Sequence, residues 1–197
     1  MYLRPVCRAG VMALVGALLQ GCIATAVGTT AAVGGSIAYD RRSTGAYIDD
    51  QIIELKSINA FGSDKELYDQ THINTTSFNN IVLLTGEAAT EELRERAGAR
   101  VGALPKVRKV YNELAVAAPS SLLSRSSDSL ITSKVKASLL DADANLFART
   151  KVVTEAGVVY LMGVVSQAEA NAASEVARRV GGVQRVVKVF EYLESAT

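Results

Sequence analysis

The sequence predicts an α+β protein built from two tandem αββαβ sandwiches that follow a flexible N-terminal segment. Three observations lead to this fold class. Residues 73–114 and 150–193 repeat one order of patterns at an offset of 76 or 77 residues. Each copy has two β-rich stretches, a longer helical pattern and a closing β-rich stretch, and a helical pattern precedes the copy. The first 22 residues form a basic and then apolar run that ends in a cysteine.

The N-terminal run has the length and the flanks of a secretory signal peptide. Arg4 and Arg8 form its basic start, and Ala9 to Leu19 form an apolar stretch of 11 residues. A bilayer-spanning helix needs about 20 such residues, whereas a signal peptide needs about 7–15. We therefore expect residues 1–21 to be a signal peptide, and not a membrane-spanning or a buried helix.

The end of this run, "LLQGC", resembles the lipobox of bacterial lipoproteins, with a small residue directly before Cys22. The resemblance implies cleavage before Cys22, a lipidated N-terminus and stable membrane anchoring through acyl chains. An ordinary signal peptide followed by an incidental buried cysteine is the alternative. Ile23 follows the cysteine, and the absence of aspartate at that position implies sorting to the outer membrane. The mature chain would have 176 residues, a net charge of −1 and no thiol free for a disulfide.

Composition limits what the remainder of the chain can be. Residues 22–45 are expected to be the lipid anchor and a flexible tether because they are rich in Gly, Thr and small residues. Continuation of a membrane helix is the alternative for this segment. The near-zero net charge gives no bulk attraction to nucleic acid, so no nucleic-acid partner is expected.

The first repeated unit is expected over residues 46–118. Asn79-Asn80 lies between two β-rich runs and predicts the tight turn of a hairpin. Leu93, Ala97 and Val101 recur at helical spacing and predict the buried face of the next helix. A closing β-rich stretch predicts a third strand, parallel to the second because a helix connects the two. Residues 119–124 are expected to be a short linker.

The second repeated unit is expected over residues 125–195 with the same order of elements. Its first helix is expected to begin at Asp128 as N-cap, with a core-facing stripe listed as Ile131, Val135 and Leu139. The sequence "EAG" at 155–157 predicts the hairpin turn. Gly181-Gly182 predicts the end of the longer helix. Each unit is therefore expected to be a mixed three-stranded sheet with helices on one face.

This order of elements, with Gly86 and Gly163 after the second strand and "GGVQRVV" at 181–187, resembles the BON domain. Two copies behind a lipobox are similar to the dual-BON outer-membrane lipoproteins of Gram-negative bacteria. The resemblance implies a periplasmic location, binding to phospholipid membranes, support of envelope integrity and enrichment at division sites. Pro105 departs from the pattern because it stands where the second copy has glycine, so a shared role for both copies stays open.

Residues for catalysis or for metal binding do not converge in this sequence. His72 is the single histidine and is expected to be a half-exposed strand residue. The start of "DADANL" at 141–146 imitates a calcium loop, but Leu146 and Val152 stand where such a loop needs glycine and glutamate. We expect residues 141–146 to be a solvated loop, and we expect no enzyme activity, no cofactor and no metal.

Charge separates the two units. Residues 46–118 carry a net charge of −3, and residues 125–197 carry +1, so only the second unit is suited to an anionic membrane. The expected partner is an anionic phospholipid membrane. The alternative function is a protein-binding scaffold in which the first unit docks envelope-assembly proteins.

The family resemblance directs the lipid contact to the first helix of the second unit. At about 100° per residue, Leu130, Lys134 and Ala137 lie on a flank away from the core stripe. The predicted lipid-binding set is Leu130, Ile131, Lys134, Lys136 and Ala137. The alternative for Leu130 is packing against the linker residues Leu122 and Leu123, with Lys134 merely solvated.

Overall fold

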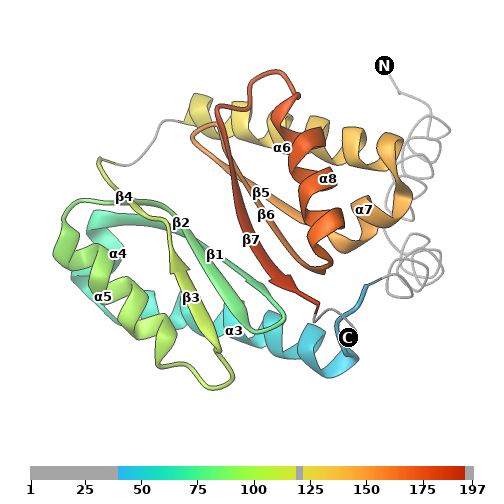
Figure 1. Cartoon of the computed structure of the whole chain (residues 1–197). Helices are drawn as coiled ribbons and strands as arrows, with labels where there is room; N and C mark the ends of the chain where they lie inside the picture. The colour runs from blue at the N-terminus through green and yellow to red at the C-terminus, as the bar shows by residue number, and fades with distance from the viewer. Residues whose placement is uncertain (1–39, 119–121, 194–197) are drawn as a thin grey trace, which may run out of the picture. The chain divides into compact units, whose positions relative to one another are not determined.

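The computed structural model describes residues 40–118 and 122–193 (Figure 1). The predicted signal peptide, Cys22 and most of the predicted tether lie outside these residues. In the described ranges, no helix is long and apolar enough to cross a membrane.

The first repeat has the predicted order of elements with two additions. It contains α3 (Thr44–Gly62), α4 (Lys65–Gln70), β1 (Thr71–Phe78), β2 (Ile81–Ala88), α5 (Glu91–Gly102), β3 (Lys109–Asn112) and β4 (Ala115–Val116). β1 pairs with β2 in antiparallel orientation, and β3 and β4 both pair with β2 in parallel orientation. The short helix α4 and the division of the closing strand into two pieces were not predicted.

The second repeat has the same topology. It contains α6 (Leu122–Ala142), α7 (Ala144–Arg149), β5 (Lys151–Glu155), β6 (Val158–Val165), α8 (Gln167–Arg178) and β7 (Arg185–Tyr192). β5 and β6 are antiparallel, and β6 and β7 are parallel. The predicted αββαβ order and the parallel crossover are therefore confirmed in both repeats.

Both predicted hairpin turns are confirmed by their backbone conformation. Asn79 and Asn80 have φ angles of 52° and 64°, and Ala156 and Gly157 have φ angles of 48° and 75°. Positive φ at both central residues is what a two-residue type I′ turn requires. Asparagine and glycine adopt this conformation at low cost.

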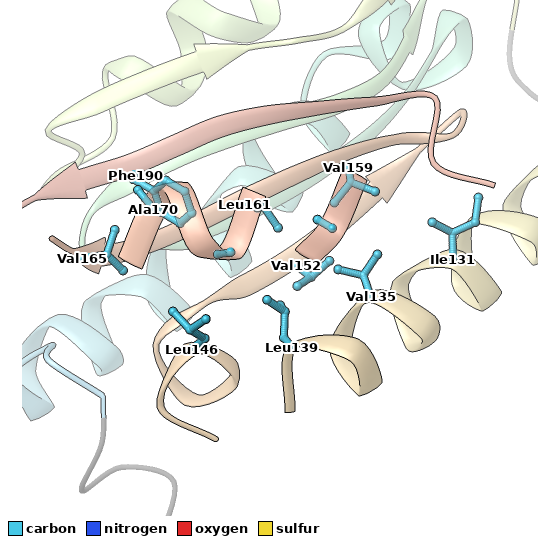
Figure 2. Close-up of a cluster of buried hydrophobic side chains, with 12 residues drawn as sticks. Ile131, Val135, Leu139, Leu146, Val152, Val159, Leu161, Val165, Ala170 and Phe190 are labelled. Carbon is cyan, nitrogen blue, oxygen red and sulfur yellow. The ribbon is translucent and has the colours of Figure 1, made fainter. Parts of the chain in front are cut away.

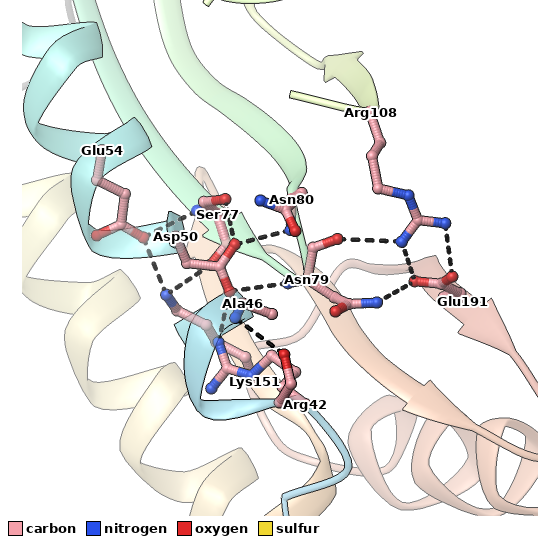
Figure 3. A network of polar contacts seen from close by, with 11 residues as sticks. Arg42, Ala46, Asp50, Glu54, Ser77, Asn79, Asn80, Arg108, Lys151 and Glu191 are labelled. Atoms are coloured by element: carbon pink, nitrogen blue, oxygen red, sulfur yellow. Dashed lines mark hydrogen bonds and ion pairs between the residues drawn. The ribbon is translucent and has the colours of Figure 1, made fainter. Parts of the chain in front are cut away.

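A buried aspartate in the first helix of each repeat binds the hairpin turn, and Figure 3 shows that of the first repeat. The Asp50 carboxylate in α3 accepts hydrogen bonds from the backbone N–H groups of Asn79 and Asn80, each at 2.8 Å. The Asp128 carboxylate in α6 accepts from Ala156 N–H at 2.9 Å and Gly157 N–H at 2.8 Å. The prediction that Asp128 is an N-cap was wrong, because α6 begins at Leu122 and the carboxylate serves the turn instead.

Each repeat has a hydrophobic core between its helices and one face of its sheet. Figure 2 shows the core of the second repeat, which contains the predicted stripe listed as Ile131, Val135 and Leu139. The corresponding core of the first repeat contains Leu93, Ala97 and Val101 of α5. The core-facing positions predicted from helical spacing are therefore confirmed.

The second faces of the two sheets are covered as well. Every residue of β2 is buried, although alternate side chains point to opposite faces of a strand. A third cluster joins side chains of both repeats, namely Phe78, Ile81, Leu83, Tyr160, Met162 and Val189. The sequence predicts helices on one face of each sheet, but it does not predict that the opposite faces pack on each other.

Ion pairs also join the two repeats (Figure 3). Arg108 Nη2 lies 2.8 Å from Glu191 Oε1, and Lys151 Nζ lies 3.1 Å from Glu54 Oε1. The Arg108 guanidinium holds the pKa of the Glu191 carboxyl below its usual value. Each pair joins a residue of one repeat to a residue of the other, so polar contacts add to the apolar contact between the sheets.

The turn after the long helix shows how the first repeat accommodates Pro105. α8 ends at Arg178, before the predicted Gly181-Gly182, and Gly182 has a φ angle of 101° in the following turn. Lys106 takes the equivalent place in the first repeat with a φ angle of 76°. Pro105 therefore leaves the conformation of this turn in place.

The region predicted as a solvated loop at 141–146 is largely helical, so that prediction was wrong. α6 continues to Ala142, and the Asp143 side chain accepts a hydrogen bond from Asn145 N–H at 2.8 Å. Asp143 is thus an N-cap, and it starts α7 directly after α6 ends.

Candidate membrane-binding surface

α6 presents two different faces to its surroundings. Its buried face packs in the core of the second repeat, and its outward face carries Leu130 with 63% of the side chain exposed. Ile131 belonged to the predicted lipid-binding set, but it is 8% exposed and lies in the core. Its inclusion in that set was wrong, because a core side chain cannot enter a bilayer without unfolding the domain.

The structure brings together three of the predicted lipid-binding residues. Leu130, Lys134 and Ala137 are all exposed and follow one another along one flank of α6. Lys136 is exposed too, but it lies about 120° from Leu130 around the helix axis. We define the α6 surface as Leu130, Lys134 and Ala137, with Lys136 outside it.

The two lysines are available for an anionic partner. Neither Lys134 nor Lys136 forms an ion pair with any residue in the described part of the chain. The side chains of Leu122 and Leu123 are outside the described residues, so the alternative of Leu130 packing on them stays open. At 63% exposure, Leu130 nevertheless offers most of its apolar surface to a partner.

A groove of about 430 Å³ lies between α6 and α8, beside the α6 surface. Lys134 and Arg179 supply its cationic groups, Val176 and Val180 supply apolar surface, and Asp141 supplies one opposing charge. Arg179 Nη2 also lies 3.5 Å from Glu175 Oε2. Lys134 therefore borders both the exposed leucine and a groove with cationic and apolar parts, which suits the headgroup region of an anionic lipid.

Two further residues, one exposed on α6 and one lining the groove, were not predicted from the sequence. Leu140 in α6 is 52% exposed, and Arg179 lines the groove. Helical spacing could have placed Leu140 outside the core stripe. Arg179 could not have been found in this way, because its position opposite Lys134 depends on how α8 packs against α6.

The other residues considered for catalysis or metal binding lie in ordinary elements of the fold. His72 is half-buried in β1, as predicted. Among the described residues, no group of three or more His, Cys, Asp or Glu side chains could hold a metal ion. The α6 surface therefore remains the candidate site.

Both repeats match one known domain family. The BON domain family matches residues 49–118 and residues 127–194. The chain belongs to the BON-domain family. Each repeat is one BON domain, and the α6 surface lies on the first helix of the second BON domain.

Several proteins with known names are similar to this dual-BON chain. It is 36% identical to the outer membrane lipoprotein DolP of Haemophilus influenzae, over 98% of this chain and 100% of that protein. It is also 36% identical to a 21 kDa hemolysin of Actinobacillus pleuropneumoniae, over 79% and 80% of the two chains. The osmotically-inducible protein Y of Escherichia coli is 30% identical over 80% of each chain.

Similarity to solved structures is weak by comparison. The C-terminal domain of CdsD, a structural protein of the type III secretion system of Chlamydia trachomatis, covers 73% of this chain. This chain covers 67% of that domain, at 14% identity and a TM-score of 0.29. Similarity this weak gives no information about the function of the BON domains.

Proposed function

We propose that this dual-BON protein is a lipoprotein of the outer membrane, acylated at Cys22 and facing the periplasm. Its second BON domain binds anionic phospholipid through the α6 surface. It supports envelope integrity at division sites, and its role is one of binding, without catalysis. The similarity to an outer membrane lipoprotein over nearly the whole chain supports the location.

One observation carries the proposed lipid contact, namely an exposed leucine on α6 beside a lysine that forms no ion pair within residues 40–118 and 122–193. Leu130 is 63% exposed, and Lys134 borders the groove that also contains Arg179. An apolar side chain flanked by cations can enter the boundary between headgroups and acyl chains while the cations stay at the phosphates. The net charge of +1 over residues 125–197 favours this domain over the first BON domain, whose net charge is −3.

The α6 surface alone supports only weak binding. A basic residue near an anionic membrane contributes about 1 kcal/mol, and a partly buried leucine contributes about 1–2 kcal/mol. Binding should therefore weaken as salt rises, because exposed charges are screened. The acyl anchor would compensate by keeping the domain at a high local concentration next to the bilayer.

We expect the double change Leu130→Glu with Lys134→Glu to abolish the phosphatidylglycerol-dependent part of vesicle binding. The physical reason is that both side chains become negatively charged at an anionic surface. The protein to use is the mature chain, residues 22–197, with Cys22→Ser so that no acyl anchor is present. Sedimentation with vesicles that contain or lack phosphatidylglycerol measures the binding.

A matched control is available elsewhere in the same domain. Lys188→Glu with Leu193→Glu makes the same two types of exchange at exposed positions in and next to β7. This control should keep wild-type binding, and both double variants should melt near the wild-type temperature. Equal binding of the α6 double variant and the wild type would contradict the proposed contact. Absence of any phosphatidylglycerol-dependent component in the binding of the wild type would instead favour the scaffold function for the second BON domain.

A further inference from the structure

The first helix of the first BON domain has an exposed apolar face. Five large apolar side chains of α3 are between 41% and 65% exposed, namely Tyr47, Ile48, Ile52, Leu55 and Ile58. At about 100° per residue they lie within an arc of about 140°, opposite the buried residues of the helix. We call these five residues the α3 stripe. Single exposed apolar residues are common on proteins, but five on one helix face form a continuous patch.

No charged residue interrupts the α3 stripe. The other residues within its arc are uncharged, namely Thr44, Gln51, Asn59 and Gly62. Lys56 stands at one edge of the stripe and is exposed, without an ion pair to a described residue. Tyr47 stands at the opposite edge, with the Arg42 guanidinium 5.2 Å from its ring centroid. The stripe is thus apolar along its middle and bordered by side chains that suit a boundary between water and hydrocarbon.

The buried face of α3 makes this distribution unusual. Asp50 and Ser57 are fully buried in the first BON domain, while isoleucines and a leucine face outward. Asp50 is needed inside because it binds the β1–β2 turn, and the Ser57 hydroxyl donates to Ile53 O at 2.8 Å. Core packing and turn binding therefore account for the inward face and leave the outward isoleucines unexplained.

The second BON domain provides an internal comparison. Asp50 and Asp128 occupy equivalent places because each binds its own hairpin turn. From this alignment, Ile52 and Lys56 correspond to Leu130 and Lys134 of the α6 surface. The remaining outward positions differ. The α3 residues Tyr47, Ile48, Leu55 and Ile58 correspond in α6 to Arg125, Ser126, Ser133 and Lys136. The first BON domain thus keeps the arrangement of an exposed apolar residue four positions before a lysine, and adds four large apolar side chains to it.

We propose that the α3 stripe is a second membrane-binding surface, which inserts into the interface of the bilayer without requiring anionic lipid. The inference rests on the proposed function for the acyl anchor at Cys22. An uncharged stripe gains its binding free energy from buried apolar area, so it does not require an anionic bilayer. The α6 surface adds a charge-dependent contact, and together the two helices make binding bivalent.

The place of α3 in the chain favours a bilayer as its occupant. Cys22 precedes the first residue of α3 by 22 positions, and a chain of that length spans at most about 75 Å. α3 is therefore the described helix that follows the proposed anchor most closely along the chain. An amphipathic helix close to a lipid anchor needs no partner with a matching groove, because a bilayer accepts a convex apolar face.

Contacts at residues 41 and 42 fix the start of α3. Arg41 forms two hydrogen bonds with the Glu169 carboxylate, at 2.6 Å and 3.0 Å. The Arg41 contact, together with bonds from Ser166 and Arg149, lowers the pKa of Glu169 to about 2. Arg42 Nη1 lies 2.8 Å from the buried Asp50 Oδ2. The chain therefore enters α3 in a defined direction, which keeps the stripe facing outward.

The test replaces three of the four distinguishing residues by their α6 equivalents, as Ile48→Ser, Leu55→Ser and Ile58→Lys. In the mature chain with Cys22→Ser, we expect binding to vesicles of phosphatidylcholine alone to fall about tenfold or more. Tyr68→Ser is the control, because it removes an aromatic side chain that is 70% exposed outside the stripe. Since all changed side chains are exposed, circular dichroism and melting should stay near wild type.

A second measurement uses the acylated protein. Acylation would block the thiol of Cys22, so Leu55→Cys carries the single free thiol for an environment-sensitive fluorophore. We expect its emission to shift to the blue when the acylated protein is reconstituted into bilayers. The same label at Ala99→Cys, on the exposed side of α5, should keep the emission of a solvated fluorophore.

The outcomes separate this inference from the proposed function. Wild-type protein that fails to bind phosphatidylcholine vesicles, or a triple variant that binds them equally well, would overturn the α3 stripe as a membrane surface. A dimer in sedimentation velocity that the triple variant converts to a monomer would overturn it in favour of a second copy. Loss of phosphatidylglycerol-dependent binding in the α6 double variant, with phosphatidylcholine binding kept, would support both surfaces.

Discussion

Replacing Ile131 with glutamate is expected to unfold the second BON domain. Ile131 is 8% exposed and packs in the core of that domain with Val135 and Leu139 (Figure 2). A carboxylate at this place loses its hydration without gaining a partner, and its neighbours lose an apolar contact. We expect the free energy of unfolding to fall by about 4 kcal/mol or more. Urea denaturation followed by circular dichroism measures this loss.

Leu130→Glu is the matched control for this change. It introduces the same charge at the next position along α6, where the side chain is 63% exposed. Its free energy of unfolding should stay within about 0.5 kcal/mol of wild type. If the two variants were equally stable, the assignment of the inward and outward faces of α6 would be wrong.

Replacing Gly86 with alanine is expected to destabilise the first BON domain by roughly 3 kcal/mol. Gly86 has a φ angle of 112°, and a Cβ atom there would lie 2.0 Å from the backbone oxygen of His72 on β1. The new side chain would both strain the backbone and push β1 away from β2. Thermal unfolding of the mature chain with Cys22→Ser gives the size of the effect.

Gly62→Ala gives the comparison that isolates this cause. Gly62 is the last residue of α3, and a Cβ atom there would have no neighbour within 4 Å. We expect the alanine to leave stability unchanged or to raise it by up to about 1 kcal/mol, because alanine has the higher helix propensity. A loss at Gly62 as large as that at Gly86 would show that close approach of the strands is not the reason.

The fold was predictable because its determinants are local. Asn79-Asn80 and Ala156-Gly157 fix the hairpin turns, and helical spacing identified the inward residues of α5 and α6. The repeat then required the second domain to follow the first. The contact between the two sheets was not predictable. Apolar strand residues such as Tyr160 and Met162 show that a sheet face is buried, but they do not show which element covers it.

The candidate site was only partly predictable for a related reason. Periodicity gives the direction of a side chain around a helix but does not say which direction faces the core. On α6 the outward flank was identified correctly, except that Ile131 was counted in both the core and the lipid-binding set. On α3 both faces carry apolar residues. Asp50 is buried, although a charged residue is usually expected at the surface. Only the packed structure shows that Ile48 and Leu55 face outward.

We propose that the α6 surface of the second BON domain binds anionic phospholipid. Backbone chemical shifts of the mature chain with Cys22→Ser, recorded with increasing amounts of bicelles that contain phosphatidylglycerol, test this contact most directly. We expect shift changes centred on Leu130, Lys134 and Ala137 and extending across the groove to Arg179. Bicelles of phosphatidylcholine alone should produce much smaller changes at these residues. Unchanged α6 resonances in the presence of phosphatidylglycerol, or changes confined to the sheets and hairpin turns, would contradict it.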